Sequence, residues 1–184
     1  MNLKENIKKY VPFNEQERKD QEYFIKWMDN FEDVLTRNNK FVHYTASAFV
    51  VNKDKTKTLM VYHNIYDGWT FPGGHADGEE NLLEVAIREV EEETGLKTKV
   101  LEKNIFSIQA YPIVSHIKRE NFISAHTHLD VIYLLEADDK KELVYREDES
   151  QGVKWFPIED LTEKHLVYFA KPTYKKLVEK LKKI

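Results

Sequence analysis

The segment 80–94 constrains the fold of this chain more than any other feature. On a helical wheel its apolar side chains share one face, and three carboxylates border that face. The apolar residues are Leu82, Leu83, Ala86, Ile87 and Val90, and the carboxylates are those of Glu89, Glu92 and Glu93. A loop with two glycines, residues 72–75, precedes the segment, and Gly95 follows it, where a helix C′ position favours glycine. The pattern predicts an amphipathic helix that packs its apolar face on a core.

The charge of the chain is concentrated in the same place. Residues 77–93 carry a net charge of −7, whereas the whole chain carries −4, so the remainder is net positive. Neighbouring carboxylates repel each other, and a helix C-terminus favours cations rather than anions. A bound divalent cation would remove both penalties, and oxygen ligands of this kind suit Mg²⁺ or Mn²⁺. A solvated acidic helix face is the alternative that the charge pattern alone leaves open.

Residues 74–96 read GHADGEENLLEVAIREVEEETGL, and this motif resembles the Nudix box. Every specified position of the box is filled, by Gly74, Glu80, Arg88, Glu89, Val90, Glu92, Glu93, Gly95 and Leu96. The resemblance implies a Nudix fold, an α+β (mixed α/β) architecture in which a mixed sheet lies between helices. It also implies metal-dependent hydrolysis of a nucleoside diphosphate linked to another moiety, by attack of water on phosphorus.

The resemblance also assigns roles to individual residues. The metal ligands would be the carbonyl of Gly73 and the carboxylates of Glu89, Glu92 and Glu93, with one of these acids as a possible base. Arg88 would hold the acidic side chains in place by ion pairing, including with Glu80. Both Mg²⁺ and Mn²⁺ fit such oxygen ligands.

Members of this family often use a further acidic residue shortly before a late strand. Glu149, six residues before Trp155, is the candidate for this catalytic role, and Glu147 is its competitor. Ordinary loop acids remain the alternative for both, because loops are usually polar without a function.

Two histidines are candidates for substrate binding. His75 follows Gly74 directly in the loop, and both are candidates for substrate binding together with His128. His126, His128 and Asp130 alternate along a predicted strand, so their side chains would share one face of the sheet. Three interpretations stay open for this trio: a metal site, contacts to substrate in the cleft, or a polar sheet face.

Several aromatic residues could stack on a base, although aromatic side chains on strands more often belong to the core. They are Tyr62, Tyr66, Trp69, Tyr111 and Tyr133. The polar stretch 115–125 is a candidate specificity loop. The basic stretch 171–184 could contact an anionic membrane or RNA, but a solvated helix with Leu177 and Leu181 packed inward is the favoured interpretation.

Alternating and apolar patterns predict the other elements. Strands are expected near residues 44–51, 58–63, 69–71, 97–100, 104–112, 127–136 and 152–156, and a terminal helix from Pro172 to the end. We divide the chain into an N-terminal helical extension, residues 1–40, and a Nudix hydrolase domain, residues 41–184.

The extension itself carries an apolar stripe at helical spacing, which predicts one amphipathic helix. The stripe consists of Phe24, Trp27, Met28, Phe31 and Leu35. Asn14 would cap its start, and Asn38 and Asn39 would mark its end. Such a helix must pack on the main domain or on a second subunit, so a homodimer is possible.

Composition excludes several other classes. The sequence has no cysteine, which excludes disulfides and thiolate metal sites and fits a reducing, cytoplasmic setting. No apolar run is long enough for a membrane span, and the small negative charge argues against general nucleic-acid binding. The expected partner is a small diphosphate substrate.

A non-catalytic nucleotide sensor is the alternative function from another class. An isomerase of prenyl diphosphates ranks lower, because such isomerases use a cysteine that this chain lacks.

Overall fold

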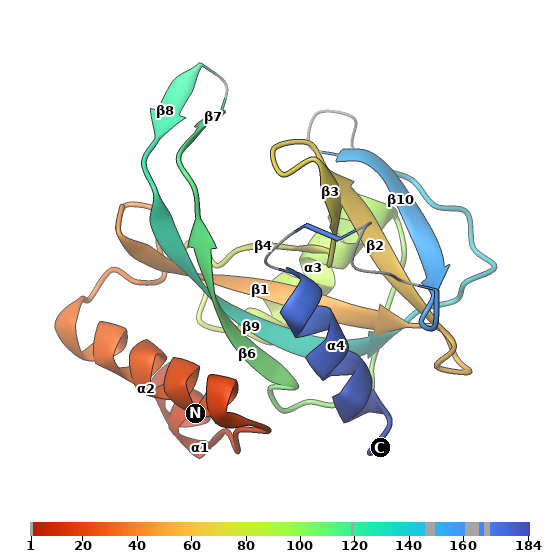
Figure 1. Ribbon diagram of the computed structural model, residues 1–184, viewed down its shortest axis with the longest axis horizontal. Helices are drawn as coiled ribbons and strands as arrows, with labels where there is room; N and C mark the ends of the chain where they lie inside the picture. The colour runs from red at the N-terminus through yellow and green to blue at the C-terminus, as the bar shows by residue number, and fades with distance from the viewer. Residues whose placement is uncertain (1, 119, 146–149, 161–165, 168–169) are drawn as a thin grey trace.

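A mixed sheet between helices forms the centre of the molecule (Figure 1). The computed structural model describes residues 2–118, 120–145, 150–160, 166–167 and 170–184. Its helices are α1 (Leu3–Lys9), α2 (Glu15–Asn30), α3 (Leu82–Thr94) and α4 (Ala170–Leu181). Its strands are β1 (Val42–Val51), β2 (Lys57–His63), β3 (Gly68–Thr70), β4 (Gly73–His75), β5 (Lys99–Val100), β6 (Ser107–Ile113), β7 (His116–Lys118), β8 (Asn121–Ile123), β9 (His126–Glu136) and β10 (Ser150–Pro157). The predicted mixed α/β architecture is therefore confirmed.

The sheet is built around the pair β1 and β9, which run parallel along their whole length. Its main order is β10-β2-β1-β9-β5, and β3, β4 and β6 pair antiparallel with β2, β1 and β9. Strand β4 pairs with the middle of β1, at Thr45 to Ser47. This pairing brings the two-glycine segment into the sheet beside the centre of β1.

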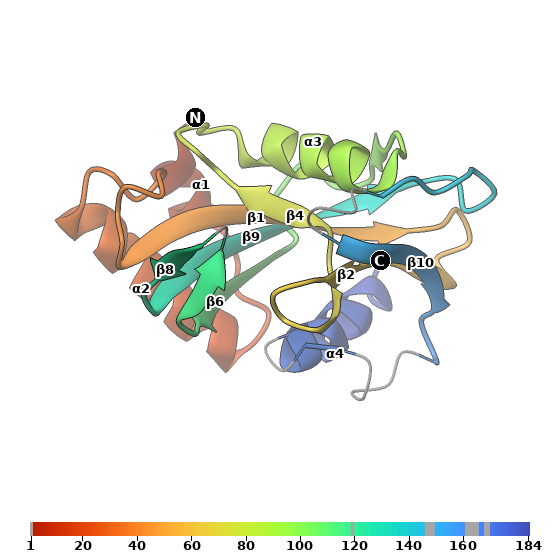
Figure 2. The ribbon, with the colours of Figure 1, turned by 90° about the horizontal axis from the view of Figure 1, so that it is seen from above.

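Helices cover both faces of the sheet, with α3 on one side and α4 on the other (Figure 2). Alternation along β1 divides the buried side chains between two clusters. Ala46 and Ala48 belong to the cluster that contains the apolar face of α3, whereas Phe49 and Val51 belong to the cluster that contains α4. The predicted burial of Leu177 and Leu181 in the terminal helix is confirmed.

The N-terminal region forms two helices where the sequence predicts one. Pro12 lies between them, and a residue before proline is disfavoured in the helical region. Asn14 caps α2 by accepting a hydrogen bond from the N–H of Glu17 at 3.0 Å, as expected. The helix ends at Asn30 rather than near residue 38, because the next residue, Phe31, is extended. Phe31 and Leu35 still pack on the core, but from outside the helix.

Helix α2 packs on the main sheet of the same chain, and its polar side chains bond the outer edge of β6. Glu17 accepts a hydrogen bond from Ser107 at 2.7 Å, and Asp20 accepts one from the N–H of Ala110 at 3.0 Å. These bonds satisfy backbone and side-chain groups on a strand edge that would otherwise be open. Lys176 of α4 is buried in the same place, which the expectation of a solvated basic helix face missed.

The short strand β4 and the hairpin β7–β8 are not predicted by any pattern in the sequence. Strand β4 is two glycines and a histidine, and only its pairing with β1 makes it extended. The hairpin β7–β8 lies in the polar stretch predicted as a loop, and it projects from the body of the molecule (Figure 1). Ile117 and Phe122 are exposed on it, so no buried face imposes a pattern. Among the described helices, none is long and apolar enough to cross a membrane.

Candidate active site

Two carboxylates of α3 lie directly against the two glycines of β4. The Oε2 atom of Glu93 accepts a hydrogen bond from the N–H of Gly73 at 2.9 Å. A Cβ atom on Gly74 would lie 2.4 to 2.6 Å from the carboxylate of Glu89, which is closer than such atoms approach. The absence of a side chain at Gly74 therefore lets the Glu89 carboxylate reach the strand backbone, whereas a Cβ on Gly73 would meet Ala46 and Ser47 of β1.

The helix itself is placed as the sequence predicts. It runs from Leu82 to Thr94 and ends at Gly95, which has a φ of 71° and so occupies the left-handed region that favours glycine. Val85 joins the expected core face, whereas Leu83 and Ile87 are only half-buried.

Arg88 links the acids on the outer side of the helix. Its guanidinium lies 3.7 Å from Glu89 and 3.8 Å from Glu92. The side chain of Glu89 is 19% exposed, whereas those of Glu92 and Arg88 are 48% and 45% exposed. The expected ion pairing of Arg88 with the helix acids is present, but Glu80 is not among the contacts of Arg88 in the described chain.

This donor set fits a hard divalent cation. Glu89, Glu92 and Glu93 supply carboxylate oxygens from consecutive turns of one helix, next to the backbone of Gly73. Oxygen ligands of this kind suit Mg²⁺ or Mn²⁺. A cation bound there would have to draw the three carboxylates together, because among the described residues only His43, His75 and His128 bring ligand atoms within 4.8 Å of one another.

Four histidines meet beside the two-glycine strand. His43 and His128 are directly opposite each other in the parallel pair of β1 and β9, and His75 of β4 lies next to both. Ring centroids lie 4.9 Å apart for His43 and His128, 5.1 Å for His43 and His75, and 5.0 Å for His75 and His128. The Nε2 atoms of His126 and His128 lie 3.1 Å apart. The structure therefore brings the candidates His75 and His128 together and adds His43, which sequence analysis missed.

Burial favours the neutral form of His43 and of His128. It lowers the pKa of His43, and repulsion from the neighbouring His126 lowers it further. It also lowers the pKa of His128 well below the ordinary value, with His75 as the largest neighbouring contribution. Removing an imidazolium from water is costly, and several imidazolium ions cannot share one site.

Asp130 shares the face of these histidines, as expected, but it binds other partners. The hydroxyls of Thr45 and Ser47 donate hydrogen bonds to its Oδ1 atom at 2.7 and 2.9 Å. Burial raises the pKa of Asp130 to about 6, although both hydroxyls act in the opposite direction. The trio His126, His128 and Asp130 is therefore not the group in which ligand atoms converge. That group is made by His43, His75 and His128.

Other predicted site residues have different outcomes. Glu149 and Glu147 lie outside the described residues. Tyr111 and Tyr133 are buried in the core region, whereas Tyr62 and Trp69 form an edge-to-face pair with ring centroids 5.3 Å apart. Tyr66 lies against His63 and is half-buried, as Tyr62 and Trp69 are, so these three aromatic residues of the set remain partly exposed.

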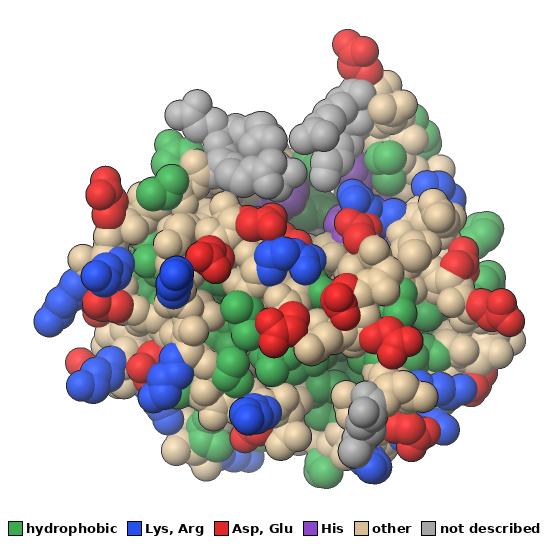
Figure 3. All heavy atoms as spheres, turned by 180° about the vertical axis from the view of Figure 1, so that it is seen from behind, with side chains coloured by type: hydrophobic (Ala, Val, Ile, Leu, Met, Phe, Trp, Pro, Cys, Tyr) green, Lys and Arg blue, Asp and Glu red, His purple; other side chains and the backbone are tan. Residues whose placement is uncertain are grey.

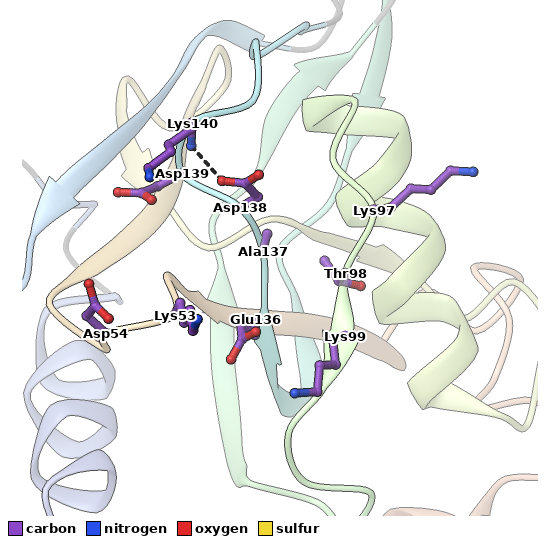
Figure 4. A pocket seen from close by; sticks show the side chains of 10 residues that line it. All are labelled: Lys53, Asp54, Lys97, Thr98, Lys99, Glu136, Ala137, Asp138, Asp139 and Lys140. Carbon is purple, nitrogen blue, oxygen red and sulfur yellow. Dashed lines mark hydrogen bonds between the residues drawn. The ribbon is translucent and has the colours of Figure 1, made fainter.

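The acids of α3 lie on an open face of the molecule. In Figure 3, Asp and Glu side chains gather around a basic side chain in the middle of this face, and histidine side chains are visible above them. A separate cavity of about 500 Å³ lies at the other end of β9 from the histidines, beside Glu136 (Figure 4). Both lysines and acidic residues line this cavity, but none of the carboxylates of α3 does. We assign no chemistry to that cavity.

Comparisons with known proteins agree with this geometry. A NUDIX domain family model matches residues 42–180. The chain is 38% identical to Nudix hydrolase 6 of Arabidopsis thaliana over 62% of its own length and 39% of that protein. It is 34% identical to the asymmetrical bis(5′-nucleosyl)-tetraphosphatase of Mus musculus, over 50% of this chain and 57% of the relative. The matched segments thus span about half the length of these two relatives.

Solved structures show the same fold. An ADP-ribose pyrophosphatase from Streptococcus suis aligns with a TM-score of 0.53 and 20% identity, over 76% of this chain and 90% of that one. An Ap4A hydrolase from C. elegans aligns with a TM-score of 0.54 and 18% identity, over 76% and 95%. At these identities the likeness concerns the fold alone. Because the family model covers more than half of the chain, this chain belongs to the Nudix domain family that the motif at residues 74–96 predicts.

Proposed function

We propose that this chain hydrolyses a pyrophosphate bond in a nucleoside diphosphate derivative, by attack of water on phosphorus. The observation that carries the proposal is the contact of the helix carboxylates with the glycine strand. Glu93 is bonded to the N–H of Gly73, and Glu89 fills the space that a side chain on Gly74 would occupy. Relatives named as a tetraphosphatase and an RNA pyrophosphohydrolase support the substrate class.

In this proposal the oxygen atoms of the site hold Mg²⁺ or Mn²⁺. The ligands would be Gly73, Glu89, Glu92 and Glu93. When bound, the divalent cation neutralises the negative charge of the diphosphate and of the leaving group. Arg88 positions Glu89 and Glu92 through its two ion pairs. Either of these acids, or Glu149, takes the proton of the attacking water.

The remaining contacts of the substrate are part of the same proposal. Gly74 offers backbone without a side chain, and His75 follows it directly. His128 lies close to His75, so the two rings can reach the same phosphate group. We also propose a cytoplasmic setting, since the absence of cysteine fits a reducing compartment. Residues 41–184 would form the hydrolase domain, and residues 1–40 an extension that packs on it.

The test is a panel of nucleoside diphosphate derivatives, scored by the release of nucleotide or phosphate with Mg²⁺ or Mn²⁺. On the best substrate, Glu93→Gln should lower kcat by about 100-fold or more, because the charge that holds the cation is lost. Glu91→Gln is the matched control, since Glu91 is exposed on the same helix and outside the acidic group. Equal activity of the Glu93→Gln and Glu91→Gln variants would contradict the assignment.

A folding control and a binding control complete the test. Both variants should have the melting temperature of the unmodified chain within a few degrees. A nucleotide that raises this temperature without any release of product, across the whole panel and with both metals, would support a sensor instead of an enzyme.

A further inference from the structure

Three strands place the imidazoles of His43, His75 and His128 around one point. Each ring offers a nitrogen, and these three nitrogens all lie within 4.8 Å of one another. The register of β1 with β9 and of β1 with β4 holds the three backbones in place. We propose that these histidines form a binding site for one transition-metal ion, separate from the carboxylates of α3.

The hydrogen bonds of His43 point to a ligand. Its Nδ1 atom lies 3.0 Å from the carbonyl oxygen of Asn39, so Nδ1 carries the proton and donates it. The lone pair is then on Nε2, which is buried without a hydrogen-bond partner in the described structure. His43 is only 5% exposed, so water does not compensate. A carbonyl that fixes one ring nitrogen while the other faces inward is the usual arrangement of a metal-binding histidine.

The chemistry of the ligands selects the metal. Neutral imidazoles bind Zn²⁺, Co²⁺, Ni²⁺ and Cu²⁺ well, whereas Mg²⁺ requires oxygen ligands. Burial lowers the pKa of both His43 and His128, which favours the neutral form that binds a metal ion. Three protein ligands leave a fourth position for a water molecule or a substrate oxygen.

The geometry needs only a small adjustment. In a tetrahedral zinc site, ligand nitrogens lie roughly 3.3 Å apart, as follows from Zn–N distances of about 2.0 Å. The three nitrogens would therefore draw together by side-chain rotation, without a change in strand register. His126 is a positioning residue for the site, because its Nε2 atom lies 3.1 Å from that of His128 and its Nδ1 atom 2.8 Å from the carbonyl of Ser124.

The site is separate from the acidic one but next to it. Gly74 and His75 are consecutive on β4, so they face opposite sides of the strand. Gly74 meets Glu89 of α3, whereas His75 meets His43 and His128. The metal-binding inference therefore stands without the proposed hydrolysis. If the chain both binds this ion and hydrolyses a diphosphate, a substrate oxygen would contact the ion rather than the imidazole rings themselves.

The test is a Co²⁺ titration of the full chain, first stripped of metal with a chelator, in excess Mg²⁺ to occupy the carboxylates. We expect one Co²⁺ per chain, with the intense visible absorption of four-coordinate cobalt, and displacement by Zn²⁺. His75→Ala and His43→Gln should each weaken binding by about 100-fold. His63→Ala is the matched control, because His63 lies on β2 beside Tyr66 and outside the cluster.

Glu93→Gln separates the two proposals. This variant should bind Co²⁺ as the unmodified chain does while losing hydrolysis. Absence of the cobalt spectrum would overturn the metal site, and so would a spectrum that both histidine variants retain. Loss of the spectrum in Glu93→Gln would also overturn it, because the ion would then be held by the acids. His75 is only half-buried, so the His75→Ala variant should fold and still provide the test if His43→Gln unfolds.

Discussion

The buried carboxylate of Glu17 should contribute more to stability than any exposed acid of the same helix. It is fully buried between α2, β6 and α4. Its contacts are Tyr10 OH at 2.5 Å, Phe13 N and Ser107 Oγ at 2.7 Å, Lys176 Nζ at 3.1 Å and Lys180 Nζ at 3.3 Å. Replacing Glu17 by Gln removes the charge that compensates the buried ammonium group of Lys176 and the partly buried one of Lys180.

The magnitude follows from the pKa of Glu17. Burial raises this pKa, but the attraction of Lys176 and the hydrogen bonds from Tyr10, Ser107 and the Phe13 N–H outweigh burial and lower it to about 2, from an ordinary value of 4.5. Such a difference between folded and unfolded chains corresponds to about 3 kcal/mol at neutral pH. Leaving a buried ion pair without one partner costs about 3–5 kcal/mol, so the two arguments agree.

The assay is urea unfolding of the Glu17→Gln variant at pH 7, followed by far-UV circular dichroism. The free energy of unfolding should fall by about 3–5 kcal/mol. Because the folded pKa lies below the unfolded one, the contribution of Glu17 is complete above about pH 4.5 and disappears as the pH falls toward 2. The difference between the variant and the unmodified chain should therefore shrink over that range.

Glu15→Gln is the matched control, since Glu15 lies two residues earlier on α2 and pairs with Arg18 in solvent. Its unfolding midpoint should stay near that of the unmodified chain. The reasoning fails if Glu17→Gln and Glu15→Gln unfold at the same urea concentration, or if the deficit of Glu17→Gln does not change with pH.

Three further predictions concern the site and its helix. Gly74→Ala should push the Glu89 carboxylate away and lower kcat by about 10- to 100-fold, with little change in melting temperature. Gly152→Ala should leave kcat unchanged, because its Cβ would make only an ordinary contact. Equal kcat values for the two variants would disprove the close approach of Glu89 to Gly74. Gly95→Ala should destabilise the fold by about 1 kcal/mol in urea unfolding, because its φ is 71°, and an unchanged midpoint would contradict this. EDTA should abolish product release and added Mg²⁺ should restore it; hydrolysis that continues in EDTA would exclude the proposed role of the cation.

Local patterns predict a large part of this protein. The helix α3, its C-terminal Gly95 and the side of the helix that carries Glu89 and Glu93 follow from residues three and four apart. The cap at Asn14 and the strands β1 and β9 are local in the same way. The match of residues 74–96 to the Nudix box is a property of the sequence alone, and it predicts the family that the domain match over residues 42–180 shows.

The tertiary structure decided what depends on distant partners. His43 joins His128 because β1 and β9 pair in parallel across 85 residues, and no local pattern specifies that register. Lys176 is buried because Glu17, far away in the sequence, meets it. Periodicity reports which face of an element is apolar, since it arises from neighbours within the element. Which side chains meet across elements is set by the packing of the whole chain, and so the histidine cluster became visible only in the fold.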